Sequence, residues 1–574
     1  MSESNRAASL LLVVALALTG CSVAAPGKAS DTGRPVRPAA EAGPLIILGS
    51  VEPNGLAVRP FVTKTGSFAS VGIFNALLAR IDPQGVPQPE LLASLPTLNT
   101  DTWEVFPDGT MRTTYMLRPN LTWHDGQPLT SDDFVFAWRV AGSPELGLPS
   151  QASQSAISDM SAIDHQRFSI RWKVPYPEAD NLSRQRGEFP PLPQHILGPA
   201  FEQLGTTGRD AFFARPFWTQ QYVGLGPYRV QQWEAGSHID AARFEGYALG
   251  VPKIARIIVR YSADQNVVVA NLLGGTAHVA TDSSISQTAA VTLEKEWAQT
   301  KGGTVLYGPG SWRSTRFQLR PELANPAAIL DPRVRQALAH TVDKPAINDA
   351  VYAGKAILTD TPIWTGSEWG AAVDDSIFSY PLDLRATETL LNQAGFAKSP
   401  DGFYRGTEGR LSLELATTGS PQSLQDVFVI ADGFRTAGVD VQQRALSSAQ
   451  QQDVQTRASF PALFTNSTSV GEAGLDSLAI PQIPTPANRW QGTNLGAWSS
   501  PEYARLMTAF KTTLDRGDRM AILRQALRIY SQELPAISQV FPPGAIAYVA
   551  SLKGQPKVKT GSEDFWNLHE WELQ

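Results

Sequence analysis

Residues that could carry out covalent or metal chemistry are few in this chain of 574 residues. The sequence contains no G-x-S-x-G nucleophile turn, no H-E-x-x-H zinc motif and no Walker A phosphate loop. No two histidines stand four residues apart, so each is expected to be solvated or hydrogen-bonded in place: His124, His165, His195, His238, His278, His340 and His569. We therefore predict no catalytic residue, no metal and no cofactor. A glycosidase carboxylate pair assembles only in the fold, so that enzyme class stays open.

The bulk composition is that of a globular protein that can bury a large core, with 42% apolar and 18% charged residues. The formal net charge is −6, and no basic stretch with interleaved aromatic residues is present to bind a phosphate backbone. Nucleic acid is therefore excluded as a partner, and a strongly anionic solute is not favoured.

The chain begins with the pattern of a lipoprotein signal. The apolar run at residues 7–18 would extend roughly 18 Å as a helix, too short for a hydrocarbon core of about 30 Å. Leu18-Thr19-Gly20-Cys21 follows and resembles the bacterial lipobox, in which the cysteine is diacylated and becomes the mature N-terminus. An ordinary signal peptide followed by a free thiol is the alternative. Cys21 is the sole cysteine, which excludes an intramolecular disulfide.

From residue 44 onward, strand-like runs alternate with helical patterns, which predicts a mixed α/β fold. Helix starts are marked at Asp331-Pro332 and Ser500-Pro501, and a further helix is expected after the polar break at 515–518. An apolar stripe at 386–394 ends at Gly395, where a left-handed cap is expected. Strands are expected at residues 45–48, 113–117, 168–172, 254–261, 411–416 and 462–464.

Five ordered blocks of sequence carry a family resemblance. In the densest, residues 112–140 (RTTYMLRPNLTWHDGQPLTSDDFVFAWRV), we expect Asp125-Gly126 to make a turn and Thr130 or Ser131 to cap a helix. The others are residues 224–280, 331–356, 390–406 and 494–554. The first of these opens with GLGPY, but no helical pattern follows, so a dinucleotide-binding loop is not favoured. Together the blocks resemble the oligopeptide, dipeptide and nickel type solute-binding proteins of ABC importers, extracellular solute-binding protein family 5.

This resemblance implies an α/β, bilobal periplasmic-binding-protein type II fold with an additional inserted domain, as in the peptide-binding cluster. The expected parts are a signal peptide (1–20), a flexible tether (21–43), lobe I in three pieces (44–85, 219–308 and 536–574), an inserted domain II (86–218) and a lobe III (309–535).

The resemblance also implies a function. The chain would capture peptides or a similar extended solute in a cleft between lobes by hinge closure, and deliver it to ABC permease subunits served by separate ATPase subunits. It would be a monomer without enzymatic activity, anchored by lipid at Cys21 on the extracytoplasmic side of the cell membrane. A ligand receptor or sensor of the same fold and a secreted hydrolase are the alternatives.

Family geometry suggests where a solute would bind. Trp312 and Arg313 follow the expected lobe crossing near residues 306–310, and Asn494 corresponds to an asparagine that meets the backbone of bound peptide in the family. The other candidates are Trp364, Trp490, Thr465, Asn466, Asn54, Thr65 and Ser67.

One position departs from the family pattern. Oligopeptide binders of this family place an acidic residue just after the strand corresponding to residues 462–465, where it pairs with the amino terminus of the peptide. Here Thr465, Asn466 and Ser467 occupy that place, and Glu472 and Asp476 come later. Because a buried ammonium needs a partner, either the ligand lacks a free amine, or Glu472 or Asp476 folds back, or the solute is not a peptide.

Overall fold

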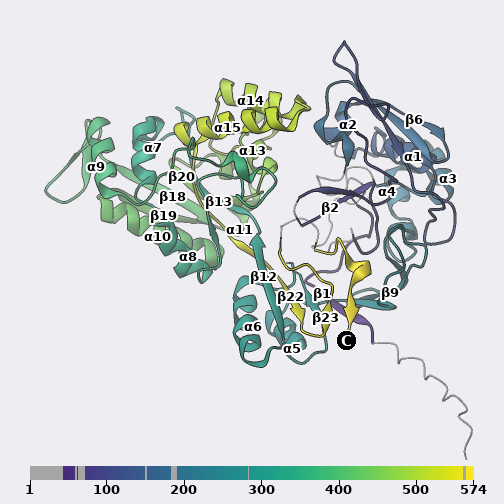
Figure 1. The fold of residues 1–574 in the computed structure, drawn as a ribbon. Coiled ribbons are helices and arrows are strands. Elements are labelled where there is room, and N and C mark those ends of the chain that lie inside the picture. The colour runs from purple at the N-terminus through teal and green to yellow at the C-terminus, as the bar shows by residue number, and fades with distance from the viewer. Residues whose placement is uncertain are drawn as a thin grey trace, which may run out of the picture. The chain divides into compact units, whose positions relative to one another are not determined.

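The computed structural model describes residues 43–58, 61, 72–83, 85–148, 152–182, 190–281, 283–559 and 564–574. The expected signal peptide and Cys21 lie outside these residues, as do Thr65 and Ser67. Three sheets of four or more strands organise the described chain, and helices connect many of their strands, so the predicted mixed α/β class is confirmed (Figure 1). None of the helices in this part of the chain is long and apolar enough to cross a bilayer.

The first sheet has seven strands in the order β12-β22-β11-β1-β10-β9-β8. Its parallel pair β1 and β10 is rich in isoleucine, leucine and valine, which favour strands. Helices α5 (Gln265–Leu273) and α6 (Gln287–Thr300) pack at its β11, β12 and β22 side. The strands are β1 (Leu45–Gly49), β8 (Tyr228–Glu234), β9 (His238–Arg243), β10 (Arg256–Tyr261), β11 (Val279–Ala280), β12 (Gly303–Pro309) and β22 (Pro543–Val549).

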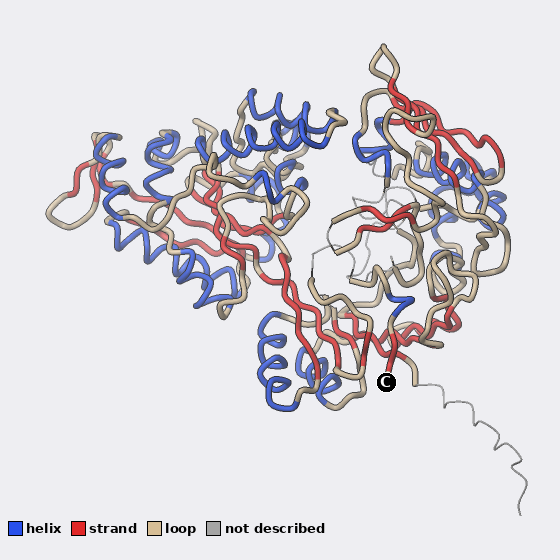
Figure 2. The backbone as a smooth tube through the Cα atoms, viewed as in Figure 1, coloured by secondary structure: helices blue, strands red, loops and turns tan. Residues whose placement is uncertain are grey.

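The second sheet has six strands in the order β14-β21-β13-β20-β18-β19, and its strands run among the helices drawn blue in Figure 2. Every residue of β13 and β21 is buried, so the centre of the sheet is covered on both faces. Strands β18, β19 and β20 run parallel to one another, whereas β13 is antiparallel to both of its neighbours. The strands are β13 (Trp312–Phe317), β14 (Ile357–Leu358), β18 (Ser412–Thr418), β19 (Asp440–Leu446), β20 (Leu463–Thr468) and β21 (Ala536–Phe541).

Nine helices belong to the described chain between β13 and β21. They are α7 (Pro332–Ala339), α8 (Lys344–Tyr352), α9 (Leu384–Gln393), α10 (Pro421–Ala437), α11 (Ser448–Gln452), α12 (Val454–Ala458), α13 (Glu472–Asp476), α14 (Pro501–Thr512) and α15 (Arg516–Glu533). A small sheet of β15 (Ala397–Lys398), β16 (Tyr404–Gly406) and β17 (Gly409–Arg410) follows α9. Helices α8 and α10 pack against each other and against this six-stranded sheet.

The third sheet has four antiparallel strands in the order β4-β5-β7-β6. Its elements are β4 (Trp103–Val105), β5 (Met111–Met116), β6 (Ile157–Asp164), β7 (Arg167–Trp172), α1 (Ser131–Ala141), α2 (Ala152–Ala156), α3 (Gln194–Glu202) and α4 (Leu204–Phe213). Two two-stranded ribbons complete the fold, β2 (Ala79–Ile81) with β3 (Pro87–Pro89) and β23 (Leu552–Lys553) with β24 (Glu572–Leu573).

The chain passes between the seven-stranded and six-stranded sheets at two adjacent points. Strand β12 leads through Gly310 and Ser311 into β13, and β21 leads through Pro542 into β22. The two passages are bonded to each other, because Gly310 N donates to Pro542 O at 2.9 Å and Pro309 pairs with Pro543. The domain limits expected from the sequence stay a prediction, although strand pairing puts β21, from residue 536 onward, in the six-stranded sheet.

The local sequence predictions agree with the structure. All six expected strands are present as β1, β5, β7, β10, β18 and β20. Asp331 caps α7 through its carboxylate as expected, and Thr130 forms a capping box with Asp133 at α1. Helix α15 begins at Arg516, inside the expected polar break, with Asp515 as its cap. Gly395 has the left-handed backbone (φ 88°) expected after α9.

The glycines of the GLGPY segment allow a close approach between two backbone segments, and no cofactor is needed to explain them. A strand, β8, follows this segment instead of a helix, as expected. Gly226 N donates to Phe74 O at 3.0 Å, and a Cβ at Gly226 would lie 2.4 Å from the carbonyl carbon of Phe74. Two backbone segments therefore touch where no side chain fits.

Replacing Gly226 by alanine should destabilise the fold by about 3 kcal/mol, because the neighbouring atoms belong to backbone that cannot rotate away. Thermal denaturation measures the change. Gly205→Ala in α4 is the matched control, since no atom lies within 4 Å of its Cβ position, and it should leave the melting temperature unchanged or slightly raised. Equal melting temperatures for the two variants would contradict this explanation.

Candidate ligand-binding site

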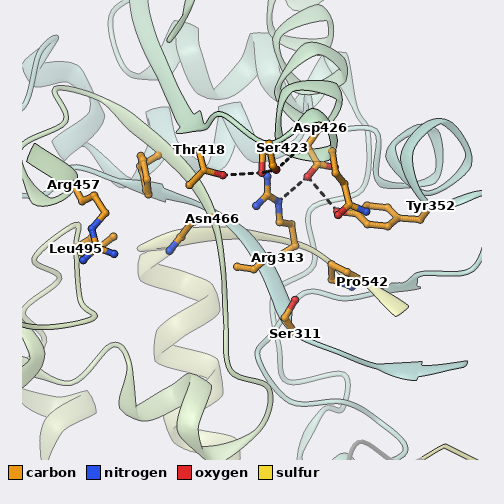
Figure 3. Close-up of a pocket in the computed structure, with 14 residues that line it drawn as sticks. Ser311, Arg313, Tyr352, Thr418, Ser423, Asp426, Arg457, Asn466, Leu495 and Pro542 are labelled. Atoms are coloured by element: carbon orange, nitrogen blue, oxygen red, sulfur yellow. Dashed lines mark hydrogen bonds and ion pairs between the residues drawn. The ribbon is translucent and has the colours of Figure 1, made fainter. Parts of the chain in front are cut away.

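A cavity of about 390 Å³ lies at the carboxyl ends of the parallel strands β18 and β20, beside the two passages between sheets (Figure 3). Ligands of α/β proteins bind preferentially outside the carboxyl ends of parallel strands. The lining residues come from strands, helices and connecting loops: Ser311, Arg313, Tyr352, Thr418, Ser420, Gln422, Ser423, Asp426, Arg457, Phe464, Asn466, Ser467, Leu495 and Pro542. Eleven of these fourteen residues are polar or charged.

Three hydroxyl groups gather where β18 leads into α10. Ser420 caps the helix by accepting a hydrogen bond from Ser423 N at 3.2 Å. Ser423 Oγ accepts from Thr418 Oγ1 at 2.9 Å and from Ser420 Oγ at 2.8 Å. Because both neighbours donate to Ser423, its own hydroxyl proton remains to be donated to another group.

A buried ion pair forms the wall of the cavity next to this hydroxyl cluster. Arg313 on β13 is 5% exposed and Asp426 on α10 is wholly buried. Arg313 Nε lies 2.7 Å from Asp426 Oδ2, which also accepts from the hydroxyl of Tyr352 on α8 at 3.1 Å. Burial raises the pKa of the Asp426 carboxyl above its usual value. The Nε–Oδ2 contact is an ion pair rather than an aligned hydrogen bond, and Arg313 Nη2 and Asp426 Oδ1 are likewise buried without a hydrogen-bond partner.

Two further arginines make this region positive. Arg457 on α12 lines the cavity, and its Nε is buried without a hydrogen-bond partner. Arg316 lies behind the lining and is wholly buried, which lowers the pKa of its guanidinium to about 10. Its Nε donates to Asn466 Oδ1 at 3.2 Å, so Asn466 presents its Nδ2 hydrogens as donors.

The structure brings three of the candidates from the sequence to this cavity or its edge. Arg313 and Asn466 line it. Trp490 is half-buried and packs against the apolar cluster that contains Phe464 and Leu495, which also line the cavity. That these three residues bind the ligand stays a prediction.

Trp312 and Asn494 lie inside the fold and not in the cavity. Trp312 is wholly buried, packs against Tyr530 of α15 and donates from its indole nitrogen to Ser538 at 3.1 Å. Asn494 Nδ2 donates to Leu478 O at 2.9 Å and to Trp498 O at 2.8 Å, and Asn494 Oδ1 accepts from Trp498 N at 3.0 Å. Because the polar groups of both side chains already have hydrogen-bond partners within the protein, we expect these side chains to stabilise the fold.

The remaining candidates in the described chain also lie away from the cavity lining. Thr465 is buried and shares a hydrogen bond with Thr315 at 2.7 Å. Trp364 is half-buried beside the apolar cluster around α14 and α15, and Asn54 is exposed.

Neither of the two late carboxylates folds back into the cavity. Glu472 accepts from the Trp369 indole at 2.5 Å, and Asp476 lies 2.6 Å from Lys511. The acidic residue that does reach the cavity is Asp426. Among the described residues, no group of three or more histidine, cysteine, aspartate or glutamate side chains is arranged to hold a metal ion.

Asp426, Tyr352, Ser423 and Arg457 were not among the sequence candidates. One signal for Asp426 was available, because Ser423, Val427, Ile430 and Phe434 form the buried stripe of α10 and Asp426 adjoins it. A charged residue beside the apolar stripe of a helix indicates a buried partner. The partner itself, Arg313, is 113 positions earlier in the chain and could not be identified from spacing.

Asn494→Ala should lower the free energy of unfolding by about 2–3 kcal/mol, because it leaves buried backbone groups of Leu478 and Trp498 without partners. Thermal or urea denaturation reports the loss. Asn54→Ala, at an exposed position, is the control and should be neutral. Loss of solute binding by Asn494→Ala at an unchanged melting temperature would instead assign this residue to the ligand.

Comparison with known proteins agrees with this architecture. Over 466 residues the chain is 23% identical to the dipeptide-binding protein of Escherichia coli K12, covering 77% of this chain and 80% of that protein. An oligopeptide-binding protein of Thermus thermophilus, solved with a pentapeptide, superposes with a TM-score of 0.67 at 19% identity, covering 92% of this chain and 96% of the other. The ABC transporter substrate-binding protein CtaP of Listeria monocytogenes superposes with a TM-score of 0.72 at 18% identity, covering 93% and 100%.

The structural neighbours share the type II periplasmic-binding-protein fold, so the fold class predicted from the sequence is confirmed. The family model for bacterial extracellular solute-binding proteins, family 5, matches residues 95–478, which is more than half of the chain. The chain belongs to the bacterial extracellular solute-binding proteins, family 5.

Proposed function

We propose that this protein captures a peptide or a similarly extended solute outside the cytoplasm and presents it to the permease of an ABC importer, without breaking a bond in the solute. The observation that carries the proposal is the polar cavity at the carboxyl ends of β18 and β20. A cavity of about 390 Å³ falls within the usual size range of small-molecule sites.

The place of the cavity supports capture by closure. Ser311 and Pro542, which line it, stand at the two passages of the chain between the six-stranded and seven-stranded sheets. Hinges are formed by a few residues at the ends of elements, so a solute bound here would contact the residues that turn when the lobes close. Differential affinity for the closed state then drives the change that the permease detects.

The names of the relatives support a peptide as the solute. A dipeptide-binding protein and a pentapeptide complex are among them, and CtaP is described as an ABC transporter substrate-binding protein. We propose the same class of partner here, namely permease transmembrane subunits with separate ATPase subunits, with the solute-binding chain acting as a monomer. We further propose that the mature protein is a lipoprotein, acylated at Cys21 and held to the extracytoplasmic face of the membrane.

Native mass spectrometry of the full chain, purified without denaturation, should show a bound peptide at one per protein. Releasing the solute and sequencing it by tandem mass spectrometry identifies it. When a fresh sample of the identified peptide is incubated with the protein, mass spectrometry should recover that peptide uncleaved. A cleaved product would contradict the proposal by showing an enzyme, and a bound glycan, lipid or metal chelate would overturn the peptide assignment.

Cys21→Ser should release the protein from the membrane fraction, because the thiol that would carry the acyl chains is removed. Fractionation followed by immunoblotting measures the distribution, and solute affinity should stay unchanged. Ser22→Ala, the neighbouring substitution, is the control and should remain in the membrane fraction. Persistent membrane association of Cys21→Ser would refute the lipid anchor.

A further inference from the structure

The charges around the cavity are unbalanced toward the positive. Arg313 and Arg457 line it, and Asp426 is the one carboxylate among its lining residues. Its Oδ2 is engaged, since it faces Arg313 Nε at 2.7 Å and accepts from Tyr352, whereas its Oδ1 is buried without a hydrogen-bond partner. Asp426 therefore compensates one arginine and leaves the other without a counter-ion in the lining.

Arg313 carries an unused donor in a buried position. The side chain is 5% exposed, and its Nη2 has no hydrogen-bond partner in the described chain. Leaving a buried charged donor unpaired is costly, so this atom is expected to gain an acceptor when the cavity is filled. A guanidinium with free N–H groups binds carboxylates particularly well, because its geometry matches two oxygens.

The neighbouring groups are donors as well. The Ser423 hydroxyl has its proton left to donate, and Asn466 presents its Nδ2 hydrogens because Arg316 occupies its oxygen. In Figure 3, Asn466 is drawn between Arg457 and Arg313. These donors call for acceptors in the solute, which a carboxylate supplies and an ammonium cannot, whereas the unpartnered Asp426 Oδ1 could accept one donor.

Helix α10 adds to the same polarity. It has 17 residues, and its first turn lines the cavity through Gln422 and Ser423, with the cap residue Ser420 beside them. The N-terminus of a helix carries a partial positive charge and favours anions. Arg316, wholly buried and with no carboxylate partner in the described chain, contributes a further positive charge behind Asn466.

We propose that this cavity binds the carboxylate of the solute, with Arg313 and Arg457 as its cationic partners and Ser423 and Asn466 as hydrogen-bond donors. A peptide is then held by its carboxyl end, and the acid expected at residues 465–467, which fall within β20, is not needed to hold an amino terminus. The inference rests on the proposed function, because it concerns the solute that this protein would carry.

Three tripeptide libraries of equal sequence diversity test the proposal: free acids, carboxyl-terminal amides and N-acetylated free acids. Equilibrium dialysis against the full chain, with mass spectrometry on both sides of the membrane, gives the bound fraction. Amidation should weaken retention at least about tenfold, because it removes a charged hydrogen-bond acceptor. N-acetylation should change retention by less than about threefold, because the ammonium that it removes has no charged partner in the proposed complex.

Substitution at Arg457 provides a second measurement. Arg457 is half-buried and outside the buried ion pair, so Arg457→Gln should fold and should reduce the preference for free acids over amides, whereas Arg457→Lys should retain most of it. Arg444→Gln on β19, whose partner is Glu414, is the matched control and should keep the full preference. Arg313 is unsuitable as a single substitution, because its loss leaves Asp426 buried and unpaired.

The outcomes separate the two proposals. Equal retention of acids and amides, together with loss of the N-acetylated library, leaves peptide capture in place and overturns the carboxylate anchor in favour of an ammonium held by Asp426. Loss of both modified libraries supports the carboxylate anchor and overturns the statement that the amino terminus needs no partner, because a second anchor would then hold the ammonium. If no free-acid peptide is retained, both the peptide function and the carboxylate anchor fail.

Discussion

The burial of Arg313 is the constraint on which the site depends. A guanidinium removed from water must be surrounded by acceptors, and here the acceptors come from elements far apart in the sequence. Asp426 on α10 takes the charge through its Oδ2, and Tyr352 on α8 donates to the same oxygen. The pair thus joins β13 to α8 and α10, which pack against the six-stranded sheet. Arg313 lines the cavity, and its Nη2 stays buried without a hydrogen-bond partner.

The same strand connects the site to the rest of the chain. Strand β13 begins two residues after Gly310, whose backbone bonds to the returning passage at Pro542. Side chains that contact solute therefore lie next to the two passages that join the sheets. A solute bound at this place acts on the backbone that must rotate when lobes close, which couples binding to a change in conformation without any chemistry on the solute.

Much of the fold could be predicted from the sequence, because its signals are local. Caps such as Asp331 before Pro332 and turns such as Asp125-Gly126 are set by neighbouring residues, and the ordered blocks gave the family. The binding site was harder to predict from the sequence. Trp312 and Arg313 were both expected to line the cleft, yet successive residues of a strand face opposite sides of a sheet. Trp312 accordingly packs toward α15 and Arg313 toward α10.

The other cavity residues converge only in the fold. Asp426, Arg457 and Ser423 are separated from Arg313 by more than 100 positions, and no spacing rule connects them. The absence of an acid at residues 465–467 was visible in the sequence, but its meaning depends on a charge balance that the structure supplies.

A crystal structure of the protein with its co-purified solute tests the central claim most directly. The account predicts solute density in the cavity at the ends of β18 and β20, with an acceptor group within hydrogen-bond distance of Arg313 Nη2. Solute bound elsewhere, with only solvent in this cavity, would contradict it.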